Sequence, residues 1–99
     1  MTGVRHVATF TFVDGVTEEQ IAAVGIGLAA LPDLIPEIEA FQFGPDAGLN
    51  DGNHHYAVVA DFASIDAYLT YRDHPAHQAV LDDRIRPILA ARAAVQFLV

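Results

Sequence analysis

The sequence has 99 residues, of which 53% are hydrophobic, enough for one domain with a modest core and too few for two. Five arginines, no lysine and 13 acidic residues give a formal net charge of −8 at pH 7, which repels nucleic-acid phosphates and anionic lipids. No apolar run approaches the roughly 20 residues of a membrane span, so we predict one domain over residues 1–99 that binds neither nucleic acid nor membranes.

The chain opens with a predicted strand. Residues 5–13 are rich in β-branched and aromatic types, which favour strands. Alternation places His6, Ala8, Phe10 and Phe12 on one face. That face turns either to the helices, where His6 would reach a ligand pocket, or to a second sheet, where it would join a subunit interface.

A helix and two further strands are predicted next. Thr17 and Gln20 form a capping box, in which each side chain hydrogen-bonds the other residue's backbone. An apolar stripe at helical spacing follows: Ile21, Val24, Leu28 and Leu31. Residues 38–44 predict a second strand and residues 54–62 a third, with a loop rich in turn formers between them.

The second helix is predicted to be broken. Ser64 caps its start, and His74-Pro75 interrupts it because the residue before a proline avoids the helical region. Pro75 suits the first turn of a new helix. The apolar stripe of that new helix is His77, Val80, Leu81, Ile85, Ile88 and Leu89. Pro87 should kink or restart it, and residues 93–99 predict the last strand.

This order of elements, β-α-β-β-α-β, is the ferredoxin-like split βαβ pattern of the α+β class. We expect a four-stranded antiparallel sheet with both helices on one face. The other face keeps apolar side chains from three strands, and an exposed patch of that size marks an interface. We therefore predict a homodimer in which two sheets pack face to face and close into an α+β barrel.

The residue types that are present restrict the chemistry. Without lysine or cysteine, a Schiff base, a thiolate nucleophile and disulfides are excluded, and the only serine is the helix cap. Histidine, tyrosine and carboxylate remain, the groups of acid–base catalysis. The lack of cysteine and of a signal-peptide pattern favours a cytoplasmic location.

The stretch "YRDHPAH", residues 71–77, concentrates these groups. His77 heads an apolar stripe and should point inward, and a histidine titrates near neutral pH. Tyr71 would orient it or polarise a substrate carbonyl. Alternatively, His77 hydrogen-bonds a backbone carbonyl and only fixes the start of the helix. His74 is better explained as a cap, and three arginines favour the dipole near the helix C-terminus: Arg84, Arg86 and Arg92.

Several segments together resemble the Dabb family, the dimeric alpha/beta-barrel or stress-responsive A/B barrel domain. They are "HVATFTF" at residues 6–12, "LPDLIPEIEAFQFGPD" at residues 31–46, "ADFAS" at residues 60–64 and "YRDHPAH". The resemblance spans nearly the whole chain, and it implies the dimeric barrel fold already expected.

Some plant members of that family are polyketide cyclases that close a ring by aldol condensation without a cofactor. The resemblance implies a substrate site between helices and sheet, with His77 and Tyr71 as the proton-transfer pair and His6 in the pocket. This sequence departs on the third strand, where Tyr56 matches a pocket histidine and His55 lies one position away. A shift of one residue turns a side chain to the other face.

We therefore predict a small apolar or aromatic ligand, with His77, Tyr71 and His6 as catalytic residues of a lyase or cyclase type. Five further residues are predicted to line the pocket: Phe10, Tyr56, Val80, Leu81 and Leu28. No histidine spacing fits a metal site, so we expect neither metal nor cofactor. Two alternatives remain, a non-catalytic stress-responsive or structural barrel and a cofactorless monooxygenase of the antibiotic-biosynthesis type.

Overall fold

The computed structural model describes residues 3–99. Its elements along the chain are β1 (Val4–Phe12), α1 (Glu18–Ala29), α2 (Leu31–Leu34), β2 (Ile38–Pro45), β3 (Tyr56–Phe62), α3 (Ile65–Asp73), α4 (Pro75–Val80), the π-helical turn η1 (Leu81–Ile85), the 3₁₀ turn η2 (Arg86–Ile88) and β4 (Leu89–Leu98).

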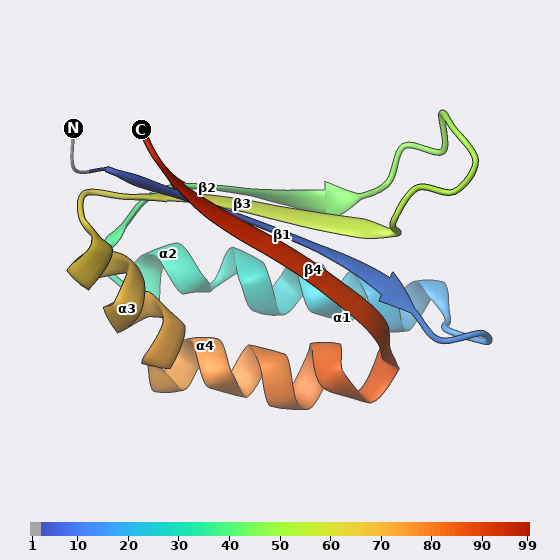
Figure 1. Cartoon of the computed structure of the whole chain (residues 1–99). Coiled ribbons are helices and arrows are strands. Elements are labelled where there is room, and N and C mark those ends of the chain that lie inside the picture. The colour runs from blue at the N-terminus through green and yellow to red at the C-terminus, as the bar shows by residue number, and fades with distance from the viewer. Residues whose placement is uncertain (1–2) are drawn as a thin grey trace.

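The four strands form one antiparallel sheet in the order β2-β3-β1-β4. All helices lie on one face of this sheet, and the other face carries none (Figure 1). This is the ferredoxin-like α+β fold that the order of elements predicts. The break of the second helix at His74-Pro75 is confirmed, because α3 ends at Asp73 and α4 begins at Pro75.

The side chains of β1 alternate between buried and half-buried along the whole strand. His6, Ala8, Phe10 and Phe12 are on its buried face, which is the face that the helices cover. Of the two orientations left open by the sequence, the structure therefore has the one that turns His6 toward the helices.

Side-chain caps fix where the helices begin. The Gln20 backbone N–H donates to Thr17 Oγ1 at 3.1 Å, and the Thr17 N–H donates to Gln20 Oε1 at 2.9 Å, so the predicted capping box is present. Ser64 accepts from the Ala67 N–H at 3.1 Å, as predicted. At the break, His74 Nδ1 accepts the Ala76 N–H at 3.0 Å and thus caps α4.

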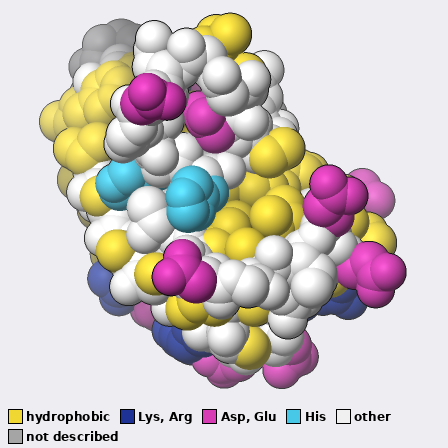
Figure 2. All heavy atoms as spheres, turned by 90° about the vertical axis from the view of Figure 1, so that its right-hand side faces the viewer, with side chains coloured by type: hydrophobic (Ala, Val, Ile, Leu, Met, Phe, Trp, Pro, Cys, Tyr) yellow, Lys and Arg dark blue, Asp and Glu magenta, His cyan; other side chains and the backbone are white. Residues whose placement is uncertain are grey.

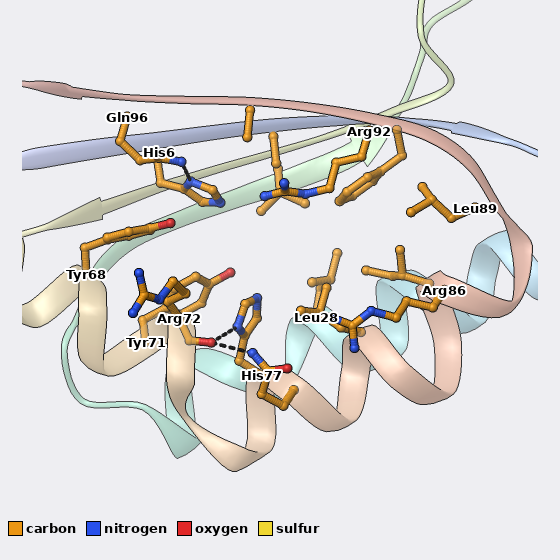
Figure 3. A pocket seen from close by; sticks show the side chains of 17 residues that line it. His6, Leu28, Tyr68, Tyr71, Arg72, His77, Arg86, Leu89, Arg92 and Gln96 are labelled. Atoms are coloured by element: carbon orange, nitrogen blue, oxygen red, sulfur yellow. Dashed lines mark hydrogen bonds between the residues drawn. The ribbon is translucent and has the colours of Figure 1, made fainter.

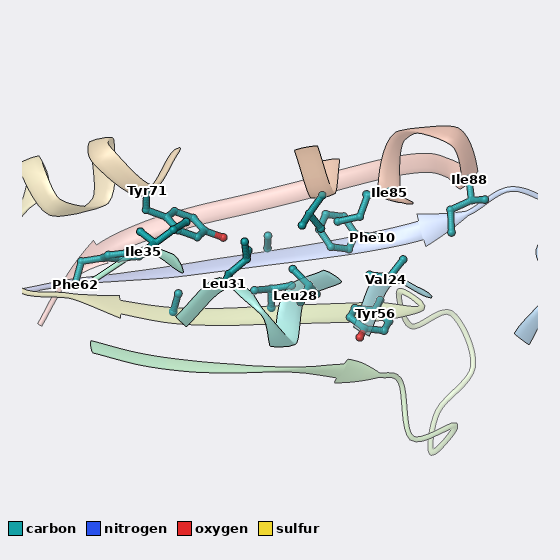
Figure 4. Packing of buried hydrophobic residues seen from close by; sticks show 14 of the residues in the cluster. Phe10, Val24, Leu28, Leu31, Ile35, Tyr56, Phe62, Tyr71, Ile85 and Ile88 are labelled. Atoms are coloured by element: carbon teal, nitrogen blue, oxygen red, sulfur yellow. The ribbon is translucent and has the colours of Figure 1, made fainter. Parts of the chain in front are cut away.

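Part of the core lies where α1 and α2 pack against the sheet (Figure 4). Val24, Leu31 and Ile35 are at most 1% exposed there. Gly27 of α1 permits close approach of the chain after α4, because a Cβ at this position would lie 2.6 Å from Arg84 Cδ. The Arg84 guanidinium reaches across to donate to the Ala23 carbonyl at 2.8 Å.

The last strand begins four residues earlier than predicted. β4 starts at Leu89 and not at residue 93, since Pro87 cannot continue the helical hydrogen-bond ladder and the chain leaves through a short 3₁₀ turn. Leu89 therefore belongs to the strand and not to the helical stripe. Arg92, expected near a helix C-terminus, lies within β4 as well.

At the end of the molecule that carries the loop between β2 and β3, acidic side chains surround an area of hydrophobic side chains (Figure 2). On this face the net negative charge is distributed around the surface and is not gathered in one patch. Within residues 3–99 no helix is long and apolar enough to cross a membrane.

Candidate active site

A cavity of about 520 Å³ lies between the sheet and the helices, beside β4. This volume is within the usual range for small-molecule sites. α4 packs against α1, α2 and α3, and η1 packs against α1. The cavity lies between these segments and the edge strand β4.

The floor of the cavity consists of three cross-strand pairs between β1 and β4: His6–Gln96, Ala8–Ala94 and Phe10–Arg92. Directly opposite residues of antiparallel strands project to the same face. Successive pairs on one face are two residues apart, roughly 6.6 Å. The two alanines in the middle therefore leave open space between two rows of larger side chains.

The helices supply the opposite wall. Polar residues gather toward one end of the cavity, with Tyr68 and Tyr71 from α3 and His77 from α4 (Figure 3). Leu28 and Leu89 lie toward the other end, where Arg86 also projects. The cavity thus offers apolar contacts beside Leu28 and Leu89 and hydrogen-bonding groups beside the tyrosines and His77.

His77 is held by the main chain. Its Nδ1 lies 3.0 Å from the Arg72 carbonyl oxygen, and a carbonyl can only accept, so Nδ1 carries the proton. In a neutral imidazole the other nitrogen, Nε2, then bears the lone pair. The ring projects from α4 into the cavity (Figure 3). His77 is therefore oriented as a base.

The acceptor on Arg72 is available because the helix is broken. The last carbonyls of a helix lack an amide partner from the next turn, and α3 ends one residue after Arg72. The Gln78 side-chain amide donates to the same oxygen at 2.7 Å. The proline break thus supplies the group that fixes the tautomer of His77.

Electrostatics keep His77 uncharged near neutral pH. Burial lowers its pKa below the ordinary value of 6.5, and the cations of Arg92 and Arg86 lower it further. The hydrogen bond to the Arg72 carbonyl opposes this shift, because it stabilises the imidazolium. A neutral imidazole is the form that can accept a proton.

Tyr71 supports His77 by stacking. Their ring centroids are 4.2 Å apart with an interplanar angle of 30°, and Tyr71 is buried. Burial is the main reason that the pKa of the Tyr71 hydroxyl is raised, so the group stays protonated and can donate a hydrogen bond. Its hydroxyl points into the cavity (Figure 3).

His6 has the complementary tautomer. The Gln96 side-chain N–H donates to His6 Nδ1 at 2.9 Å, so the proton of the neutral ring is on Nε2. Burial, with the charges of Arg92 and His77, lowers the pKa of His6 to about 4. His6 therefore presents a donor where His77 presents an acceptor, and both histidines line the same cavity.

Residues 4–99 match the family model for the Stress responsive A/B Barrel Domain, Dabb. The chain belongs to the Dabb family. A curated Dabb relative, the stress-response A/B barrel domain-containing protein HS1 of Arabidopsis thaliana, is 36% identical over 76 residues, which are 75% of this chain and 70% of HS1.

Solved structures agree with this assignment. A dimeric ferredoxin-like protein of unknown function from Thermobifida fusca is 46% identical, with a TM-score of 0.92 over 99% of this chain and 92% of that one. The hydroxynitrile lyase of Passiflora edulis superposes with a TM-score of 0.86 over 99% of this chain and 94% of that one. At 17% identity the lyase shows the shared fold alone.

In this Dabb domain, six of the eight predicted site residues line the cavity: His77, Tyr71, His6, Phe10, Leu28 and Leu81. Tyr56 and Val80 do not, so their assignment to the pocket is corrected. Tyr56 is on the part of β3 that α1 covers, and its hydroxyl lies beside Gly25. Val80 is buried against Gly27, where it fills the contact between α4 and α1.

Six polar residues that line the cavity were not predicted as site residues from the sequence: Tyr68, Arg72, Gln78, Arg86, Arg92 and Gln96. The ring centroid of Tyr68 is 5.2 Å from that of His6. The signal for Arg92 and Gln96 was their spacing with Ala94, which places all three on one face of a strand. That signal is visible only once the strand is known to begin before residue 92.

The adjacent histidines before β3 have other partners. His54 Nδ1 lies 2.8 Å from Thr9 Oγ1, and His55 Nδ1 accepts the Phe12 N–H at 2.9 Å. Neither residue lines the cavity. Across residues 3–99, no three His, Cys, Asp or Glu side chains come together as a metal site would require.

Proposed function

We propose that this Dabb domain binds a small apolar or aromatic molecule in the cavity and catalyses proton transfer on it, in a lyase or cyclase type of reaction without a cofactor. His77 acts as the base, Tyr71 and His6 as hydrogen-bond donors. The observation that carries this proposal is the pair of opposite tautomers, fixed by the Arg72 carbonyl at 3.0 Å and the Gln96 amide at 2.9 Å, on two histidines of one cavity.

The proposed chemistry begins at a carbon next to a carbonyl. His77 Nε2 takes a proton from this carbon, and the C–H electrons form an enolate whose oxygen accepts from His6 Nε2–H or the Tyr71 hydroxyl. The enolate carbon then attacks a second carbonyl of the same molecule. The resulting alkoxide receives the proton from the His77 imidazolium, which restores the neutral base. Acid–base groups contribute typically 10²–10⁴-fold.

A direct test is exchange of the α-protons of phenylacetone for deuterium in D₂O at pD 7.4, followed by NMR. This reaction needs a base and an enolate-stabilising donor but no co-reactant. We expect exchange above the buffer rate, with saturation, and a loss of about 10²–10⁴-fold in His77→Gln. Cleavage of mandelonitrile to benzaldehyde and hydrogen cyanide tests the lyase direction with the same variant.

His54→Gln is the matched control, because His54 is a histidine outside the cavity. It should retain wild-type exchange, and far-UV circular dichroism should show both variants folded. If His77→Gln exchanged as fast as wild type, or if wild type did not exceed buffer with either substrate, the catalytic proposal would be wrong.

One observation favours a second candidate, a binding protein without catalysis. In the described chain, the only hydrogen bond of His77 is to a backbone carbonyl, as expected if the ring simply stabilised the start of α4. Ligand binding without any exchange that depends on His77 would select this alternative.

We further propose a homodimer formed by the uncovered face of the sheet. Val7, Val59 and Val95 are adjacent on this face through the pairs Val7–Val59 and Val7–Val95, and Val95 and Phe97 are 55% and 45% exposed. Exposed apolar area of this kind marks an interface. The Thermobifida fusca relative is described as dimeric, which supports the proposal.

Analytical ultracentrifugation tests the dimer. Val95→Asp should shift the protein to monomer, because two carboxylates would be buried across the interface. Ile26→Asp is the control, since Ile26 is a 66% exposed residue of α1, on the opposite side of the sheet. A Val95→Asp variant that sediments as wild type would exclude this face as the interface.

A further inference from the structure

Arg92 is the charged group of the cavity that lacks a partner. It projects from β4 to the helix-covered side, opposite Phe10 in the register, and its guanidinium extends along the floor toward His6 (Figure 3). No carboxylate within residues 3–99 forms a salt bridge with it.

The other two arginines of the cavity already have carboxylate partners. Arg72 donates to both carboxylate oxygens of Asp73 at 2.9 and 3.0 Å, and Arg86 pairs with Asp82. No aspartate or glutamate is among the described residues that line the cavity. A chain with a net charge of −8 thus has a locally positive site, and Arg92, on the exposed edge strand, is its cation without a carboxylate partner.

The space beside Arg92 fits a small anion. Ala94 separates Arg92 from Gln96 along β4, and Ala8 lies opposite Ala94, so no large side chain occupies the middle of the floor. A group bound there would lie between the Arg92 guanidinium and the polar end that holds His6 and His77. It would be accessible from the edge of the sheet, because β4 is an outer strand.

We propose that the ligand of this cavity is a carboxylate, an apolar or aromatic acid whose carboxylate binds Arg92 while its ring lies toward Leu28 and Leu89. This inference rests on the proposed function and names its substrate class. The planar guanidinium matches a carboxylate with two parallel hydrogen bonds. A phosphate would bring up to two charges to a single free cation beside apolar walls, which leaves charge uncompensated.

Matched pairs of acids and amides test the proposal: benzoate and benzamide, 2-naphthoate and 2-naphthamide, and biphenyl-4-carboxylate and its amide. Dissociation constants are measured by titration calorimetry at pH 7. We expect wild type to prefer the acid of a pair by about tenfold to a hundredfold, the usual value of a hydrogen bond to a charged group. Arg92→Gln should abolish the preference and leave the affinity for the amide unchanged.

Two further variants test whether the preference for acids depends on the positive charge at position 92. Arg92→Lys keeps the charge and should retain part of the preference, and Arg5→Gln should retain it in full because Arg5 lies outside the cavity. A second readout is the pKa of His6 by NMR. The Arg92 charge lowers this pKa, so 2-naphthoate binding should raise it in wild type and not in Arg92→Gln.

The outcomes separate this proposal from the proposed function. If wild type binds acids and amides equally, or if Arg92→Gln keeps the preference for acids, the carboxylate assignment is overturned and the apolar site remains. If no member of any pair binds, the assignment fails together with the proposed function.

Discussion

The two halves of the layer between helices and sheet are built differently. Under α1 and α2, side chains such as Val24, Leu31 and Ile35 are fully buried. Beside β4, the same layer contains a cavity of about 520 Å³ lined with histidine, tyrosine and arginine. One half thus provides folding stability, and the other retains polar groups and open volume that a stable fold alone does not need.

The largest expected effect is a difference in how much stability is lost when a side chain is removed from one half or from the other. Leu31→Ala removes a side chain from the half under α1 and α2 and should cost about 2–5 kcal/mol, a large part of a total of roughly 5–15 kcal/mol. Leu89→Ala only enlarges an existing cavity and should cost about 1 kcal/mol or less. Urea unfolding at fixed protein concentration measures both, and equal losses would contradict the comparison.

A substitution that fills the cavity should have a smaller effect. It should weaken ligand binding and leave folding stability unchanged. Ala94→Phe places a ring over the alanine pair of the floor and should weaken binding of aromatic ligands at least tenfold. The melting temperature should not fall, since an aromatic residue favours a strand. Titration calorimetry measures the affinity of the variant for aromatic ligands. Affinity equal to that of wild type would mean that ligands do not occupy the floor.

A further expected effect is a pH dependence of stability from His6. Its pKa of about 4 in the folded state is below the ordinary 6.5, so the unfolded chain binds a proton that the folded chain does not. This contribution is constant above pH 6.5 and reduces stability as the pH falls from 6.5 to 4. His6→Gln should therefore show a shallower decline of Tm over that range, whereas His54→Gln should decline as wild type does. Equal slopes in wild type and His6→Gln would argue against a low pKa for His6.

Sequence reasoning was most successful where local chemistry decides the structure. The period-2 pattern of β1, the capping box at Thr17 and the proline break at His74 are local signals, and each predicted its element correctly. The inward direction of His77 followed from its place in an apolar stripe. These signals gave the fold and six of the eight residues predicted for the pocket.

The residues that sequence reasoning misplaced or missed are those whose surroundings depend on tertiary packing. Tyr56 is on the buried face of β3, but only the position of α1 shows that it is outside the cavity. Val80 has helical spacing from His77, yet its contact is with Gly27 of another helix. Arg92 was missed because "LAAR" at residues 89–92 is compatible with helix or strand, and the pairing with β1 selects the strand.

The hydrogen bond from His77 to the Arg72 carbonyl makes the proposed base tolerant of mutation. Every amino acid carries a backbone oxygen, so no replacement of the Arg72 side chain removes the acceptor, whereas a catalytic triad loses its orienting carboxylate through a single codon change. Removing this acceptor would require residues 72–76 to join into one continuous helix, in which the Ala76 amide would occupy the oxygen. Pro75, through its preference for extended geometry in the preceding residue, opposes that rearrangement.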